Sequence, residues 1–147
     1  MKRSQRIQAI VEIKAAQEKN ALEALGASQK KMQEIEAQLE SLKIYRREYQ
    51  ERFNRLARDG ASVAQLMEFR SFMDKLDKAI SGQELSLQGS RAEFQAKKQN
   101  WENRHNQTTS LQKVCDAAVV IEKKRDDKIE QGEQDEWASR FVQSRSG

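Results

Sequence analysis

The chain has 147 residues, with no proline, six glycines, 37% hydrophobic residues and 34% charged residues, which excludes a compact globule with a large apolar core. Its regular spacing of Leu, Ile, Met and Phe argues against a disordered chain, so we expect a long helical protein. The net charge of +4 arises within residues 1–60, but charges of both signs alternate there without interleaved aromatic residues, which argues against a nucleic-acid-binding protein.

Residues 1–58 are predicted to form the first coiled-coil helix. Apolar side chains recur every seven residues in two series, the a and d positions of a heptad lettered a to g. Polar residues interrupt them at Lys14, Glu18, Ser28 and Arg46, so we expect the N-terminal end to pack more loosely. The a series holds Val11, Leu25, Met32, Leu39 and Phe53, and the d series holds Ile7, Ala21, Ile35, Leu42, Tyr49 and Leu56.

Residues 59–62 are predicted to form a turn between two helices. Gly60 can take the left-handed conformation that ends a helix, and Ser62 with Gln65 has the spacing of a capping box for the next one. Two helices joined by so short a turn run antiparallel, which pairs residue i with a residue near about 121 minus i.

Residues 63–121 are predicted to form the second coiled-coil helix, and a sustained heptad repeat predicts a left-handed supercoil. The repeat continues through Cys115 and loses its apolar character at Glu122 and Arg125. Residues 122–147 are therefore predicted to form an unpaired C-terminal extension that is helical and then disordered. Six successive a positions of the second helix are Leu66, Met73, Ile80, Leu87, Phe94 and Trp101.

Catalytic and ligand-binding motifs are not apparent in the sequence. There is no Gly-rich phosphate loop, no pair of His ligands and no Ser-His-Asp arrangement, and His105, which follows a d position, is interpreted as a flanking residue. We therefore expect a protein that is not an enzyme, without catalytic residues, cofactor or metal.

The sequence also predicts a cytoplasmic protein that does not insert into the membrane. The longest apolar stretch, residues 117–121, is far shorter than the roughly 20 residues that cross a bilayer, and the N-terminus lacks the apolar core of a signal peptide. The single cysteine, Cys115, cannot form an internal disulfide, which suits a reducing compartment, and is interpreted as a packing residue.

An additional apolar stripe follows the predicted turn. Phe72 and Ala79 fall at g positions, outside the a/d seam, and share a helix face with Leu76 and Gln83. A two-stranded seam does not need an exposed Phe72, so the stripe is interpreted as a partner-binding face. The alternatives are that Phe72 folds over the edge of the core or packs in a self-association. Trp137, in the extension, is interpreted with Phe141 as a second docking site or a disordered anchor.

Several segments together resemble the FliJ family of flagellar type III export proteins, over nearly the whole chain. They are Tyr45-Arg46-Arg47-Glu48-Tyr49, Phe69-Arg70-Ser71-Phe72 with Leu76, Ala79 and Ile80, Trp101, and Asp135-Glu136-Trp137-Ala138-Ser139-Arg140. The resemblance implies a fold similar to the central stalk of rotary ATPases, with the terminal end inside the ring of the export ATPase FliI. The implied ring contacts are Asp135, Glu136, Trp137 and Arg140.

The resemblance further implies that the export gate protein FlhA binds the stripe of Phe72, Leu76, Ala79 and Gln83, with Gln83 replacing a histidine of other members. FliH and export chaperones are further implied partners, and the implied location is the cytoplasmic face of the inner membrane. Two alternatives remain open from the pattern. One is a coiled-coil scaffold or chaperone of an injectisome-type secretion system, and the other is a nucleic-acid-binding helical hairpin.

Overall fold

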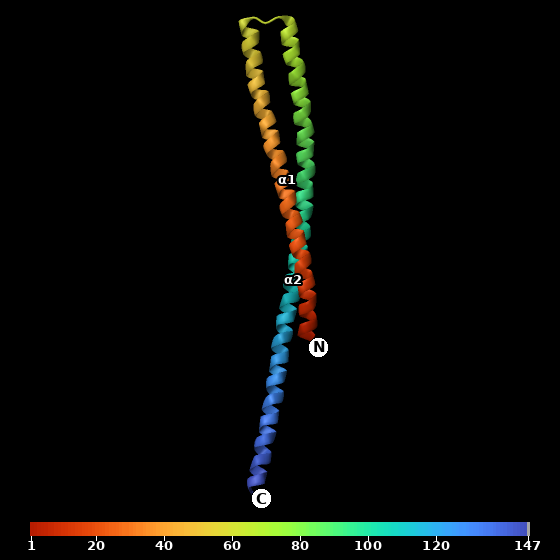
Figure 1. Ribbon diagram of the computed structural model, residues 1–147, viewed down its shortest axis with the longest axis vertical. Coiled ribbons are helices and arrows are strands. Elements are labelled where there is room, and N and C mark those ends of the chain that lie inside the picture. Colours follow the sequence, from red (N-terminus) through yellow and green to blue (C-terminus); the bar gives the residue numbers. More distant parts are fainter. Residues whose placement is uncertain (147) are drawn as a thin grey trace. The chain divides into compact units, whose positions relative to one another are not determined.

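The structure is a computed structural model that describes residues 1–146, and these residues form two helices, α1 (Arg3–Asp59) and α2 (Val63–Ser146). Within the described range there is no strand, and the predicted all-α helical hairpin is confirmed (Figure 1). Packing divides the chain into two units. The turn unit is Asn20–Trp101, and the terminal unit combines Met1–Lys19 with Glu102–Gly147.

The turn between α1 and α2 has the local chemistry that the sequence indicates. Gly60 has a φ of 91°, in the left-handed region that glycine adopts without steric penalty. The capping box is formed in both directions, because the backbone N–H of Ser62 donates to Oε1 of Gln65 (3.1 Å) and the backbone N–H of Gln65 donates to Oγ of Ser62 (3.2 Å). These bonds satisfy N–H groups at the start of α2 and fix where the chain reverses.

The buried side chains in both units lie at the a and d positions, as the heptad pattern predicts. Polar residues stay in this register: Ser28 and Ser90, at d positions, are 5% and 4% exposed. Each is satisfied by its own helix, because Oγ of Ser28 donates to the carbonyl of Leu25 (2.8 Å) and Oγ of Ser90 donates to that of Leu87 (3.0 Å). The buried apolar residues, 3–8% exposed, are Val11, Ala21, Leu39, Met73, Leu76, Leu87, Cys115 and Ala118.

Contacts between the helices in the turn unit follow the predicted antiparallel register. The Gln38–Gln83 hydrogen bond (2.7 Å) matches the relation between paired residue numbers, and the contact between Arg46 and Asp77 departs from it by two residues. Figure 1 shows the two helices of this unit side by side, joined at one end by the turn.

In the terminal unit, pairing continues past the predicted limit at residue 121. Glu122 accepts hydrogen bonds from the backbone N–H (3.0 Å) and the hydroxyl (2.5 Å) of Ser4, and Lys2 forms an ion pair with Asp126 (2.9 Å). The apolar pattern ends at Glu122, but these polar contacts fasten the first turn of α1 to α2. The hydrogen bonds to Ser4 also lower the pKa of the Glu122 carboxyl.

Beyond Asp126, α2 continues as a single helix through Ser146, which differs from the expected change to disorder (Figure 1). Side chains four residues apart support the helix locally, as in the ion pair between Glu136 and Arg140 (2.7 Å). The segment contains no proline to interrupt it. Over the residues described, neither helix combines the length and apolar character needed to cross a membrane.

Candidate partner-docking surfaces

In both the turn unit and the terminal unit, α1 and α2 pack along an a/d seam that has one side on its left and one on its right. We call the side carrying heptad positions e and b the e side, and the side carrying positions g and c the g side. Because the helices are antiparallel, e positions of α1 face e positions of α2, and g positions face g positions. The chemistry of the two sides can therefore differ over a whole unit.

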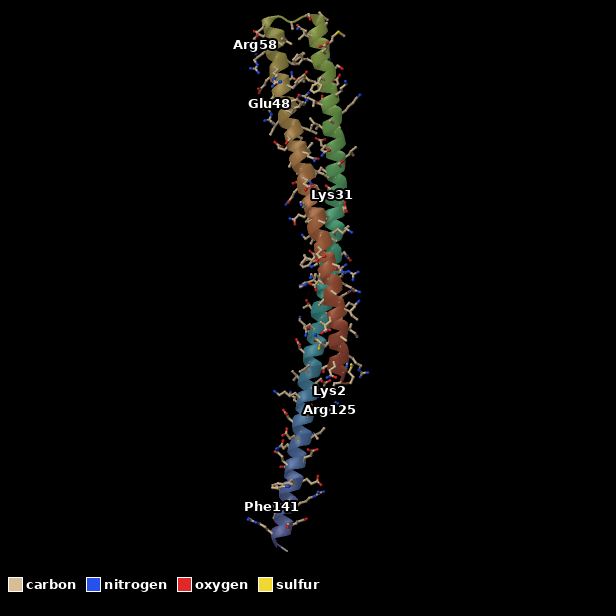
Figure 2. The ribbon with its side chains drawn as sticks, in the orientation of Figure 1. Lys2, Lys31, Glu48, Arg58, Arg125 and Phe141 are labelled. Atoms are coloured by element: carbon tan, nitrogen blue, oxygen red, sulfur yellow. The ribbon has the colours of Figure 1, made fainter. Side chains whose placement is uncertain are left out.

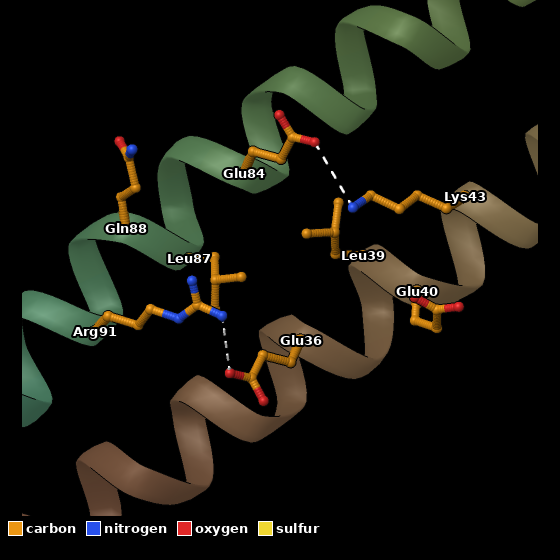
Figure 3. Close-up of a pocket in the computed structure, with 8 residues that line it drawn as sticks. All are labelled: Glu36, Leu39, Glu40, Lys43, Glu84, Leu87, Gln88 and Arg91. Carbon is orange, nitrogen blue, oxygen red and sulfur yellow. Dashed lines mark hydrogen bonds and ion pairs between the residues drawn. The ribbon is translucent and has the colours of Figure 1, made fainter.

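The e side of the turn unit is held by ion pairs across the seam. Lys43 lies 3.9 Å from Glu84, and Arg91 lies 3.4 Å from Glu36, on either side of the buried leucines Leu39 and Leu87 (Figure 3). The space between them is a groove of about 460 Å³ with a largely charged rim. Lys43 and Arg91 are therefore matched within the hairpin, whereas Glu40 in the lining of the groove takes part in no ion pair among the described residues.

One further pair joins the e side to the seam. Nε of Arg46 donates to Oδ1 of Asp77 at 2.5 Å, and this bond lowers the pKa of the Asp77 carboxyl and raises the pKa of the Arg46 guanidinium. Arg46 occupies an a position, where the heptad pattern calls for an apolar side chain. Asp77 compensates the charge there, so the polar interruption does not break the register.

Near the turn, aromatic rings from both helices form a cluster that extends from the a/d seam onto the g side. The ring of Tyr49 lies 4.8 Å from that of Phe69 and 4.7 Å from that of Phe72, measured between centroids. Tyr45 meets Phe72 edge-on at 6.2 Å, and Phe53 completes the cluster at 6.2 Å from Phe69. Both tyrosines and three of the five phenylalanines of the chain gather here, so the cluster is a main element of packing in this unit.

Next to the aromatic cluster, the g side has an apolar groove of about 600 Å³ that lies mainly on α1. Its edge on α2 is Gln83, whose side-chain amide donates to Oε1 of Gln38 across the seam (2.7 Å). Small side chains on α1 leave the space open. The g side does have an ion pair, between Lys31 and Glu93 (3.5 Å), but Lys31 lies about two helical turns from Gln38. The groove is lined by Ala37, Gln38, Ser41, Leu42, Tyr45 and Gln83.

The structure brings the four residues of the predicted stripe together but gives them different environments. Leu76 is buried at 7% exposure, Ala79 is exposed, and Gln83 is half-buried at the groove. Phe72 is also half-buried, under the rings of Tyr45 and Tyr49, so the expectation of an exposed ring is corrected. Phe72 therefore has a packing role, and Ala79 is the freely accessible member of the stripe.

Sequence reasoning missed the contribution of α1 to this surface. Tyr45 occupies a g position, and antiparallel pairing places g positions of α1 opposite those of α2, where Phe72 and Ala79 lie. Applying that rule to Tyr45 would have predicted its contact with Phe72. The candidate surface is consequently formed by both helices, with the aromatic cluster at one end and the apolar groove at the other.

The predicted ring-contacting residues lie on the single-helix part of α2. Trp137 is 67% exposed and its ring stacks on that of Phe141 (5.6 Å), with the Arg145 guanidinium 5.0 Å from the Phe141 ring. Figure 2 labels Phe141 near the C-terminal end of α2. Glu136 and Arg140 form an ion pair with each other, and Asp135 is exposed. This helix end presents a small aromatic surface to solvent, without a second helix beside it.

Within residues 1–146, no group of three or more His, Cys, Asp and Glu side chains could hold a metal ion. His105, the only histidine, lies with Nδ1 2.6 Å from Oε1 of Glu18 in the terminal unit. The grooves described above are shallow features between two helices. The arrangement defines a class of protein: an all-α, two-helix coiled coil.

Comparison with protein families identifies the chain more closely. The family model described as "Flagellar FliJ protein" matches residues 2–147, so the chain belongs to the FliJ family and is a component of the flagellar protein export apparatus. Comparisons with curated proteins and with solved structures gave no match.

Proposed function

We propose that this chain is a non-catalytic, stalk-like coiled coil that binds the ring of the export ATPase FliI and links it to the export gate protein FlhA. It would act at the cytoplasmic face of the inner membrane through these partners. The observation that carries the proposal is the difference between the two sides of the turn unit. On the e side two ion pairs span the seam at a largely charged groove, and on the g side an exposed Ala79 lies near an apolar groove.

The gate contact is assigned to the g side of the turn unit. An exposed alanine and a groove of small side chains allow a partner's apolar side chains to approach closely, and the aromatic cluster holds this surface rigid. The amides of Gln38 and Gln83 at the rim can donate to or accept from a partner's backbone. We therefore propose that FlhA contacts Ala79 and Gln83 directly, whereas Phe72 and Leu76 support the surface from beneath.

The ATPase contact is assigned to the end of α2. Trp137 and Phe141 are large apolar side chains that remain exposed, because no second helix lies beside this part of α2. Exposed apolar patches of this kind mark sites where a partner binds. Asp135, Glu136 and Arg140 surround them with charges of both signs. A helix end of this kind can insert among the subunits of a ring and promote its assembly and its ATP turnover.

Retention assays with the two partners test the proposal. Purified full-length chain on a column should retain FliI and the cytoplasmic domain of FlhA, each alone. Replacing both aromatic residues, Trp137→Ala with Phe141→Ala, should abolish stimulation of FliI while leaving FlhA retention unchanged. Val142→Ala is the matched control, because Val142 is 64% exposed on the same helix end but faces another direction. Unchanged stimulation by the double variant would place the ATPase contact elsewhere.

The family match favours flagellar export over the alternative of an injectisome scaffold. The nucleic-acid-binding alternative makes a separate prediction. Affinity for DNA or RNA would fall steeply with salt, with a slope set by the number of phosphates neutralised.

A further inference from the structure

We infer that the terminal unit carries a third docking surface, a basic and apolar face on its g side that binds an acidic amphipathic helix of another protein. This face is separate from the surfaces proposed above for FlhA and FliI. Its apolar members are Ile10 and Ile13 of α1 with Val114, Ala117 and Ile121 of α2, and its cations are Arg3, Arg6, Lys14, Lys124 and Lys128.

The apolar part of this face is exposed although it lies beside a well-packed seam. Ile10, Ile13, Val114 and Ile121 are 46%, 60%, 46% and 57% exposed, whereas Cys115, between the last two, is 3% exposed. Single exposed apolar residues are ordinary on a protein surface. Several on the same side of two adjacent helices form a patch, and such patches mark sites of interaction.

The cations of this face have no internal counter-charge. Within the described residues, none of them takes part in an ion pair, whereas neighbouring Lys2, outside the face, is paired with Asp126. The g and c positions of the paired segments, residues 3–17 and 107–128, hold no acidic residue. A face with several free cations and no carboxylate is electrostatically complementary to an acidic partner.

The seam beside this face is internally satisfied. Glu122 accepts two hydrogen bonds from Ser4, His105 contacts Glu18, and the thiol of Cys115 donates to the carbonyl of Ser4 (3.5 Å).

The e side of this unit also has a groove, of about 370 Å³ with the exposed Val119 at its edge. The e side carries the carboxylates of Glu12 and Asp116, however, so the two sides differ in charge.

The shape of the face fits a helix. A groove of about 470 Å³ runs between the helices at Lys14 and Leu111, one helical turn from Ile10 on α1 and within one turn of Val114 on α2. From Val114 to Lys128 the face spans roughly 20 Å along α2 at 1.5 Å per residue, the length of about four helical turns. The groove itself is lined by polar side chains as well as Leu111, so an amphipathic helix can place its apolar stripe against the neighbouring Ile10 and Val114 and its carboxylates against the flanking cations.

Two other occupants fit less well. A membrane-surface helix typically inserts Trp, Phe or Leu, and the exposed apolar residues of this face are isoleucine, valine and alanine, with Leu111 half-buried at the groove. The acidic residues 126–136 of a second copy supply charge, but Ile129 is their only apolar side chain, so they lack an apolar stripe that could cover the exposed isoleucines and valine of this face.

The test uses the full-length chain and two synthetic amphipathic peptides of about 20 residues with the same leucine stripe, one flanked by glutamates and the other by lysines. Fluorescence anisotropy should show that the chain binds the glutamate-flanked peptide and does not bind the lysine-flanked peptide. Lys124→Glu should weaken binding about tenfold, whereas Lys123→Glu, which changes the same charge at the adjacent exposed position outside the face, should weaken it far less. Likewise Ile121→Ser should weaken binding and Val120→Ser should not, with helix content of each variant checked by circular dichroism.

Equal losses for the two lysine variants would show that only net charge matters and would overturn the proposal. Binding to phosphatidylglycerol vesicles without binding to the acidic peptide would also overturn it, in favour of a membrane surface. A dimer in sedimentation velocity that Lys124→Glu dissociates would overturn it in favour of a second copy.

Discussion

The e side and the g side of the turn unit are built from the same two helices and the same heptads, yet their chemistry differs. On the e side, Lys43 and Arg91 find carboxylates across the seam, and their interactions are completed within the hairpin. On the g side, rings and small side chains meet, and the groove beside Ala79 remains open. The two sides of one coiled coil can thus differ in chemistry while they share the same seam.

The largest expected effect comes from the seam that both sides share. Leu39→Ala or Leu87→Ala should lower the free energy of unfolding by about 2–4 kcal/mol, because each side chain is at most 7% exposed and its removal leaves a cavity. Urea denaturation followed by circular dichroism measures the loss. A loss near zero at both positions would mean that the seam does not stabilise the turn unit.

A smaller effect is expected for the ring that supports the g side. Phe72→Ala should cost about 1–3 kcal/mol, because the ring is half-buried between Tyr45 and Tyr49. The exposed Ala79→Ser is the comparison on the same side and should cost under about 0.5 kcal/mol. If the two variants have equal urea midpoints, the Phe72 ring has no packing role and is free for a partner.

The smallest effect concerns the terminal unit, where Ser4 holds Glu122. The pKa of Glu122 is below the ordinary value of 4.5, chiefly because the Ser4 hydroxyl and then its backbone N–H donate to the carboxylate. A depressed pKa in the folded state means that the stabilisation is complete above pH 4.5 and is lost as pH falls through the folded pKa.

An NMR titration of the glutamate side chains tests this contact. The pKa of Glu122 should lie below 4.5, and Ser4→Ala should move it upward. An unchanged Glu122 titration in Ser4→Ala would show that the hydroxyl does not hold the carboxylate.

The fold could be predicted largely from the sequence, because heptad spacing and capping chemistry are local signals. The register of Ser28 and Arg46 was correct even though both are polar, since the flanking apolar positions fix the phase of the helix. The end of α2 was harder to predict, because its helix depends on side-chain contacts such as Trp137 with Phe141 rather than on a seam.

The candidate surface could be predicted only on one helix. The stripe of Phe72 and Ala79 is visible as residues outside the seam of α2, but the cover that Tyr45 gives Phe72 depends on packing between helices. The groove depends likewise on which small side chains of α1, such as Ala37 and Ser41, lie opposite Gln83. Heptad letters give the side on which a residue lies, and only the packed pair shows how much of it remains accessible.

The most direct test of the account is calorimetric binding of the FlhA cytoplasmic domain to two charge variants of the turn unit within the full-length chain. Ala79→Asp places a carboxylate on the g side, and Ala92→Asp places the same carboxylate at another exposed alanine of α2, at heptad position f, which faces away from α1 and lies outside the g side. Ala79→Asp should lose several kcal/mol of binding free energy, because its unpaired charge is buried at the interface, whereas Ala92→Asp should lose almost none. Both variants should have the melting temperature of the unmodified chain. Equal affinity of the two variants for FlhA would contradict the assignment of the g side as the gate-binding surface.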